Sequence, residues 1–102
     1  MRLPKRLLAV PAFALLAGCG PIQSTSALID ADVELEAARA AGAQTTAVYE
    51  YTAAEVFLHK ARETQGRSQY EASGRFAQKA AELAKSARQK ALESSNKAEE
   101  TP

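Results

Sequence analysis

The sequence has few of the residues that cross-link small domains or build catalytic sites. It has a single cysteine, Cys19, so no disulfide can form within the chain. It has one histidine, His59, and no tryptophan, and only 6% of its residues are aromatic. A common hydrolase or transferase needs a nucleophile beside a base, two carboxylates in a dry cleft, or a metal. We therefore expect a protein that is not an enzyme, with no cofactor and no small-molecule substrate.

An excess of charge of one sign is also missing. The chain has 13 Lys and Arg against 12 Asp and Glu, a formal net charge of +1. Three of the basic residues, Arg2, Lys5 and Arg6, stand at the N-terminus, and those of the second half are interleaved with acids such as Glu71 and Glu82. Nucleic-acid binding requires a dense positive field on one face. The composition therefore predicts no nucleic-acid partner.

Residues 1–18 have the zones of a secretion signal. A positive start is followed by an apolar run over residues 7–17, which is shorter than the roughly 20 residues that span a bilayer. The run ends in Leu16-Ala17-Gly18-Cys19, which resembles the lipobox of bacterial lipoproteins: an aliphatic residue, two small residues and a cysteine. The resemblance implies cleavage between Gly18 and Cys19. It also implies a diacylglycerol on the Cys19 sulfur and a fatty acid such as palmitate on the new amino group.

An acylated Cys19 would make a membrane the first partner of this chain. Each buried methylene adds about 0.8 kcal/mol of membrane affinity, and stable anchoring needs more than one acyl chain. Gly20, rather than an aspartate, follows the cysteine. By resemblance to enteric lipoproteins, this favours the periplasmic face of the outer membrane over the inner membrane. The alternative is an ordinary secretory signal with a chance cysteine.

The remaining sequence predicts an all-α fold, a three-helix bundle that contains an antiparallel helical hairpin. From residue 27 to residue 100 there is no proline, and Ala, Glu, Lys, Arg, Gln and Leu, all good helix formers, dominate. We expect a lipidated cysteine and polar tether at 19–26, an Ala-rich helical domain at 27–97 and a frayed tail at 98–102. Within the domain, helices are expected at about 26–41, 46–65 and 68–97.

Two breaks define these helices. Gly42 predicts the first, although a single bent helix over 27–65 is the alternative. At the second, Gly66 is expected to be the left-handed residue that ends a helix. Ser68 and Glu71 are expected to form a capping box at the start of the next one.

Plotting each helix at 100° per residue separates apolar and polar faces. The second helix has one apolar stripe (Ala47, Tyr51, Ala54, Leu58, Ala61), and so has the third (Tyr70, Ser73, Phe76, Ala77, Ala80, Leu83, Ala84, Ala87, Ala91). The first helix has two opposite strips, Leu28, Ala31, Leu35 and Ala38 on one side and Ile29, Val33, Ala37 and Ala40 on the other. Two strips predict two neighbours, either a helix and a partner chain or a helix and the lipid surface. Ile29, Val33 and Tyr49, which points away from its stripe, are the candidate partner-binding residues.

One candidate metal site lies on the polar face of the second helix. Glu55, His59 and Glu63 are spaced by four residues, so they align along the helix and could bind a divalent ion weakly. A solvent-exposed ladder of ion pairs is the expected role of these residues. We therefore predict no metal, and weak metal binding is an alternative function.

The two helices of the hairpin resemble a small Ala-rich domain of unknown function carried by many Gram-negative lipoproteins. The resemblance rests on Ala54-Glu-x2-Leu-x-Lys-Ala61 and on Tyr70-x2-Ser-x2-Phe-Ala-x-Lys-Ala-x2-Leu-Ala84. Some of those proteins continue into an OmpA-like peptidoglycan-binding domain, which this sequence lacks. The resemblance implies a lipid-anchored module of the cell envelope that binds another envelope protein or self-associates. A coiled-coil tether between outer membrane and cell wall is the alternative, although the ending Glu-Glu-Thr-Pro102 lacks the C-terminal lysine of a covalently linked tether.

Overall fold

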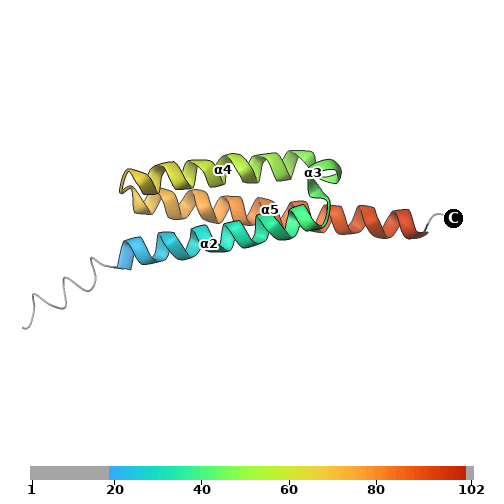
Figure 1. The fold of residues 1–102 in the computed structure, drawn as a ribbon, viewed down its shortest axis with the longest axis horizontal. Coiled ribbons are helices and arrows are strands. Elements are labelled where there is room, and N and C mark those ends of the chain that lie inside the picture. Colours follow the sequence, from blue (N-terminus) through green and yellow to red (C-terminus); the bar gives the residue numbers. More distant parts are fainter. Residues whose placement is uncertain (1–18, 101–102) are drawn as a thin grey trace, which may run out of the picture.

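The computed structural model describes residues 19–100, and this part of the chain contains helices and no strand. Three long helices, α2 (Cys19–Ala40), α4 (Val48–Gly66) and α5 (Tyr70–Glu100), are joined by the short α3 (Ala43–Thr46) and a tight turn. Figure 1 shows α5 between the other two, antiparallel to α4 and parallel to α2. The all-α prediction and the helical hairpin are confirmed.

Each long helix buries residues that are separated alternately by three and four positions. These residues, the inner seam, are Ala31, Leu35 and Ala38 in α2; Tyr51, Ala54, Leu58 and Ala61 in α4; and Ser73, Ala77, Ala80, Ala84, Ala87 and Ala91 in α5. A mean spacing of 3.5 residues keeps one side of a helix against its neighbours over many turns. Since most seam residues are small, the helix axes can approach closely. The apolar stripes predicted for the hairpin helices are therefore its packing faces.

Gly42 ends the first helix, as predicted. Its φ of +83° is the left-handed conformation, which glycine adopts without the steric cost that a Cβ would add. Its N–H donates to the carbonyl of Arg39, and its own carbonyl accepts from the N–H groups of Thr45 and Thr46. The alternative of one helix over 27–65 is wrong, because the chain reverses here.

The second turn is built differently from the prediction. Gly66 is helical, and the left-handed residue is Ser68, with φ +63°. The N–H of Ser68 donates to the carbonyl of Gln65 and that of Gln69 to the carbonyl of Thr64, both at 2.9 Å. These bonds form a Schellman motif. Because Ser68 completes the end of α4, it does not begin α5, and the expected capping box with Glu71 is replaced by this motif.

The helices are also longer than predicted at both ends. Residues 20–26 were expected to form a polar tether, but they belong to α2, and Ser24 is buried. Proline is tolerated in a first helical turn, where its missing N–H has no partner to lose, so Pro21 does not prevent this. The hydroxyls of Ser24 and Thr25 donate to the Pro21 carbonyl at 3.2 and 2.8 Å. At the other end, residues 98–100 continue α5 instead of beginning a frayed tail.

Polar contacts fix the register between the helices. In the α4–α5 interface the buried hydroxyl of Ser73 donates to the carbonyl of Ala61 at 2.7 Å. Between α2 and α4, Arg62 pairs with Asp32. Arg39 Nε also donates to the Tyr51 hydroxyl at 3.0 Å, and this bond raises the pKa of the Arg39 guanidinium.

A further ion pair joins α4 to α5. Lys90 of α5 donates to the Glu50 carboxylate of α4, and this hydrogen bond lowers the pKa of Glu50 below its ordinary value. Both residues are sequence neighbours of inner-seam residues: Glu50 precedes Tyr51, and Lys90 precedes Ala91. The pair joins helix segments that are 40 residues apart in the chain.

Candidate lipid and partner surfaces

Large apolar side chains are more often exposed than fully buried in the described part of the chain. Eleven of the fourteen buried apolar residues are alanine, and the other three are Leu35, Tyr51 and Leu58. Seven large apolar side chains are exposed: Ile22, Ile29, Val33, Val48, Tyr49, Val56 and Leu92. Single exposed apolar residues are ordinary, but contiguous ones mark interaction surfaces. Six of these seven belong to two groups, one on α2 and one on α4.

The first group, the α2 strip, consists of Ile22, Ile29 and Val33. These residues are spaced by seven and four positions, so they follow one side of the helix. Pro21, Thr25, Ser26 and Asp30 line a shallow hollow with the two isoleucines. The other side of α2 carries its part of the inner seam. The two opposite strips predicted for this helix are therefore present, and among residues 19–100 only one of them is covered.

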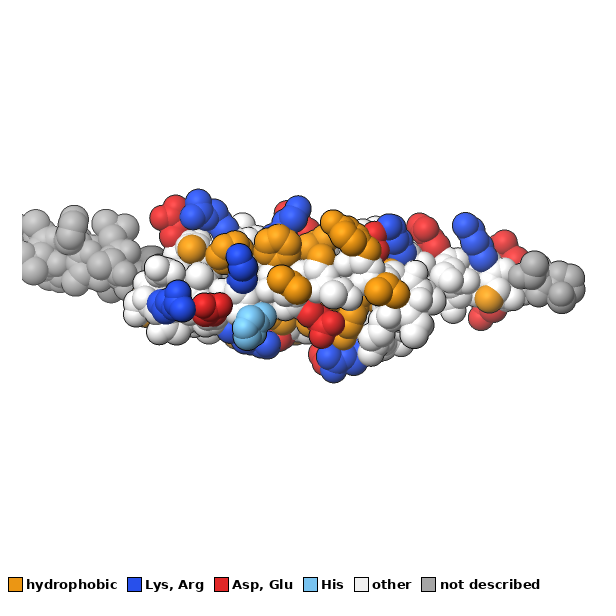
Figure 2. All heavy atoms as spheres, turned by 90° about the horizontal axis from the view of Figure 1, so that it is seen from above, with side chains coloured by type: hydrophobic (Ala, Val, Ile, Leu, Met, Phe, Trp, Pro, Cys, Tyr) orange, Lys and Arg blue, Asp and Glu red, His pale blue; other side chains and the backbone are white. Residues whose placement is uncertain are grey.

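The second group, the α4 patch, consists of Val48, Tyr49, Thr52, Ala53, Val56 and Phe57. Tyr49 is the most exposed of the large apolar residues, at 77%. Figure 2 looks onto the α4 side of the bundle, where hydrophobic side chains gather in a row between charged residues. The patch reaches α5 through Phe57, whose ring centroid lies 6.2 Å from that of Phe76. The ammonium group of Lys60 lies over the other aromatic partner, 5.5 Å from the Phe76 centroid.

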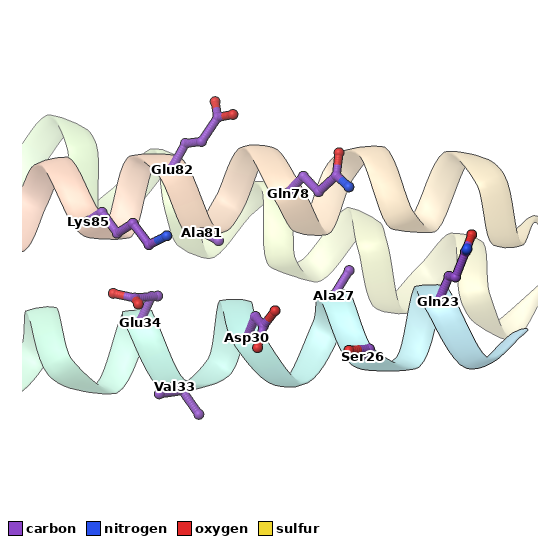
Figure 3. Close-up of a pocket in the computed structure, with 10 residues that line it drawn as sticks. All are labelled: Gln23, Ser26, Ala27, Asp30, Val33, Glu34, Gln78, Ala81, Glu82 and Lys85. Atoms are coloured by element: carbon purple, nitrogen blue, oxygen red, sulfur yellow. The ribbon is translucent and has the colours of Figure 1, made fainter. Parts of the chain in front are cut away.

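A polar groove of about 800 Å³ is lined by residues of α2 and α5, which pack against each other. Its lining includes Asp30, Glu34 and Glu82, with Lys85 as its basic residue, and Figure 3 shows Glu34 and Lys85 entering it from opposite helices. One carboxylate oxygen of Glu34 is buried without a hydrogen-bond partner. The groove therefore carries more carboxylates than ammonium groups, and Val33 is its one apolar lining residue larger than alanine.

His59 lies on the exposed side of α4. Of its two expected companions, Glu63 bonds instead to Arg67, at 3.0 Å, one turn further along. Among residues 19–100 no three His, Cys, Asp or Glu side chains lie close enough together to hold a metal ion. The spacing of Glu55, His59 and Glu63 aligns them along the helix without assembling a site.

Cys19 is the first residue of α2, three positions before Ile22. The rest of the predicted lipobox, with the cleavage position at Gly18, lies outside the described residues. No helix within residues 19–100 is long and apolar enough to cross a membrane.

Comparison with known proteins assigns no family to this chain. No family model, no curated protein and no solved structure matches it.

The three candidate partner residues occupy two separate surfaces. Ile29 and Val33 lie together on the α2 strip, whereas Tyr49 lies in the α4 patch. Ile22 and Val48 were missed. Ile22 falls in the same three-four series as Ile29 and Val33, but its neighbours Gly20 and Pro21 had suggested a tether. The helical period alone, extended through Pro21, places Ile22 on this strip.

Proposed function

We propose that this protein is a lipid-anchored helical module of the bacterial cell envelope, held by an acylated Cys19, that binds another envelope polypeptide. The observation that carries the proposal is the distribution of side-chain size: eleven of the fourteen buried apolar residues are alanine, whereas seven large apolar side chains are exposed, six of them in two groups. A monomer that served only its own fold would gain more by burying those side chains. Exposing them is consistent with partners outside the chain.

The α4 patch is the surface assigned to the protein partner. Tyr49 and Phe57 have the character of interface anchors, because aromatic side chains supply a large contact area with little loss of conformational entropy. Thr52 and Ala53 are small and lie between the larger side chains, so a partner can approach the α4 backbone there. The patch is also flanked by Lys60, whose charge could pair with a carboxylate on the partner.

A coiled-coil tether is less well supported. The alternating three and four spacing that such a tether needs is present, but α2, α4 and α5 of one chain use it to pack against each other. The outward faces of α2 and α4, rather than the inner seam, are left for contacts with other molecules.

Site-specific photocrosslinking in cells tests the assignment of the partner surface. A photoreactive phenylalanine analogue would replace Tyr49 in one version of the full chain and Leu92, which is also exposed, in the control. We expect a discrete crosslinked polypeptide from position 49 and none from position 92. Equal crosslinking from both positions, or none from position 49, would contradict the assignment.

Fractionation tests the anchor. A Cys19→Ser variant cannot receive a thioether-linked diacylglycerol. Because the substitution also disrupts the lipobox, residues 1–18 of the variant would be replaced by an ordinary cleavable secretion signal, and we expect the processed variant to leave the membrane fraction in which the wild-type chain is recovered. Since Cys19 is the only cysteine, no disulfide is lost with the substitution. Equal membrane recovery of both proteins would show that the acyl chains are not what holds the domain.

A further inference from the structure

The N-terminal half of α2 carries an unbroken series of positions on one side of the helix. Cys19, Ile22, Ser26, Ile29 and Val33 are separated by three, four, three and four residues, the spacing that also defines the inner seam. Within the series the three aliphatic side chains are exposed, and Ser26 is exposed as well. The position predicted to carry the acyl chains is therefore in register with the α2 strip.

The start of α2 at Cys19 restricts how the domain can sit on a bilayer. With a flexible tether, the bundle could take any orientation relative to its lipid. Because the helix begins at Cys19 itself, the acyl chains would leave from the end of a rigid element. Val33 lies 14 residues further on, roughly 21 Å along the axis at 1.5 Å per residue. If α2 stood upright, Ile29 and Val33 would point into water far above the bilayer surface.

We infer that α2 lies along the bilayer, with Ile22, Ile29 and Val33 inserted at the boundary between headgroups and acyl chains. This inference rests on the proposed acylation of Cys19 and specifies the orientation that the anchor imposes. An interfacial helix buries an apolar face to a depth of about 5–10 Å while its polar side chains stay at headgroup level. Asp30 and Asp32, on the two flanks of the strip, would occupy that level.

The charges around the strip indicate which lipid surface it fits. Interfacial helices that bind anionic membranes carry lysine and arginine beside their apolar face. Here the neighbours on α2 are acidic, and two of them are already paired: Asp32 with Arg62 and Glu36 with Arg39. No excess of positive charge faces the lipid on α2. A zwitterionic surface such as phosphatidylcholine is therefore the expected occupant, and added anionic lipid should not strengthen the contact.

This orientation assigns different binding partners to the two exposed surfaces, lipid to the α2 strip and protein to the α4 patch. Since α2 and α4 flank α5 on either side (Figure 1), a bundle that rests on α2 leaves the α4 patch available to a protein partner. The residues Ile29 and Val33, predicted from the sequence to bind a partner, would then contact lipid, and Tyr49 would remain for protein.

Depth-dependent fluorescence quenching of the full acylated chain tests the orientation. Single cysteines would be introduced by Ile29→Cys and, as the matched control, by Val56→Cys. Both positions are aliphatic and comparably exposed, at 57% and 54%. Acylation leaves the introduced cysteine as the only free thiol for an environment-sensitive dye. The labelled proteins would be reconstituted into phosphatidylcholine vesicles that contain lipids brominated near the headgroup, and circular dichroism would check that they remain helical.

We expect quenching of the dye at position 29 to be at least threefold stronger than at position 56. Replacing a fifth of the lipid by phosphatidylglycerol should leave the quenching unchanged or reduce it. Equal quenching at both positions, weak or strong, would overturn the inference, as would a several-fold increase with phosphatidylglycerol, which would assign the contact to basic residues. Failure of the proposed function gives a different result, because an unacylated Cys19 would react with the dye and appear as a second label in the intact mass.

Discussion

The inner seam and the outward faces of α2 and α4 follow the same alternation of three and four residues. The seam holds mostly small side chains, whereas the outward faces hold larger ones. In the seam, α5 contributes five alanines and Ser73, and only Leu35, Tyr51 and Leu58 of the other helices are large. Outside, the corresponding positions of α2 and α4 hold Ile, Val and Tyr. The comparison teaches that burial in this fold follows from which side chains allow helices to approach, since Ile22, Ile29 and Val33 of α2 are left exposed while Ala31 and Ala38 are buried.

Enlarging a seam residue gives the largest effect on stability. Ala84 is fully buried in the middle of α5, so Ala84→Leu should force the helices apart and lower the free energy of unfolding by about 1–3 kcal/mol. The matched control is Val56→Leu on the outer face of α4, which should change it by less than about 0.5 kcal/mol. Urea unfolding followed by circular dichroism measures both. A similar loss of unfolding free energy in the two variants would mean that Ala84 is not buried between the helices or that Val56 is not exposed.

Removing the buried hydroxyl of the seam should have an intermediate effect. Ser73→Ala deletes the 2.7 Å bond to the Ala61 carbonyl, so we expect a loss of about 1 kcal/mol relative to a serine that makes no such bond. Ser95→Ala, exposed near the end of the same helix, corrects for the better helix propensity of alanine. If the two substitutions changed the free energy of unfolding by the same amount, the hydrogen bond of the Ser73 hydroxyl would not contribute to stability.

The outer strips are expected to matter least for the fold. A double variant, Ile29→Ser and Val56→Ser, removes one aliphatic side chain from each surface, and both are already more than half exposed. Its free energy of unfolding in the absence of lipid should stay within about 1 kcal/mol of the wild-type value, about 0.5 kcal/mol for each exposed site. Loss of helicity at 25 °C would contradict the view that these residues serve external partners.

The ion pair between Glu50 and Lys90 should give a small dependence on pH. Because the pKa of Glu50 is lower in the folded chain than its ordinary value, the pair stabilises the fold above the unfolded glutamate pKa, about 4.3. This contribution is lost as the pH falls through the folded pKa. We expect the urea midpoints of wild type and Glu50→Gln to differ at pH 7 and to converge as the pH falls through the folded pKa of Glu50. A constant difference across that range would exclude this ion pair as the cause.

The helices and the seam could be predicted because their signals are periodic and repeated over many residues. The stripes of α4 and α5 were recognised from spacing alone, and Gly42 from the conformational freedom of glycine. Which strip of α2 would be buried could not be predicted, because each predicted strip holds two large aliphatic residues and two alanines. The choice depends on the close approach of α5, a property of the packed helices and not of α2 alone.

The remaining errors concern single residues at helix ends. The turn after α4 was expected to use Gly66 in the left-handed conformation, and it uses Ser68. The left-handed position lies two residues later because the Thr64 and Gln65 carbonyls find their donors in the backbone of Gln69 and Ser68. Pro21 suggested a tether, whereas it lies in the first turn of α2. In both cases the residue type is compatible with more than one local structure: glycine with a helix or a left-handed position, and proline with a tether or a first helical turn. The packing of the helices decides which of them forms.

The central claim is that the outward apolar residues serve a lipid-anchored protein, and the intact mass of the chain recovered from bacterial membranes tests it most directly. The account predicts a polypeptide that begins at Cys19 and carries two or three fatty acyl chains. Tandem spectra of the N-terminal peptide should place the mass of these chains on Cys19. A chain that begins at any other residue, or a Cys19 with an unmodified thiol, would contradict it.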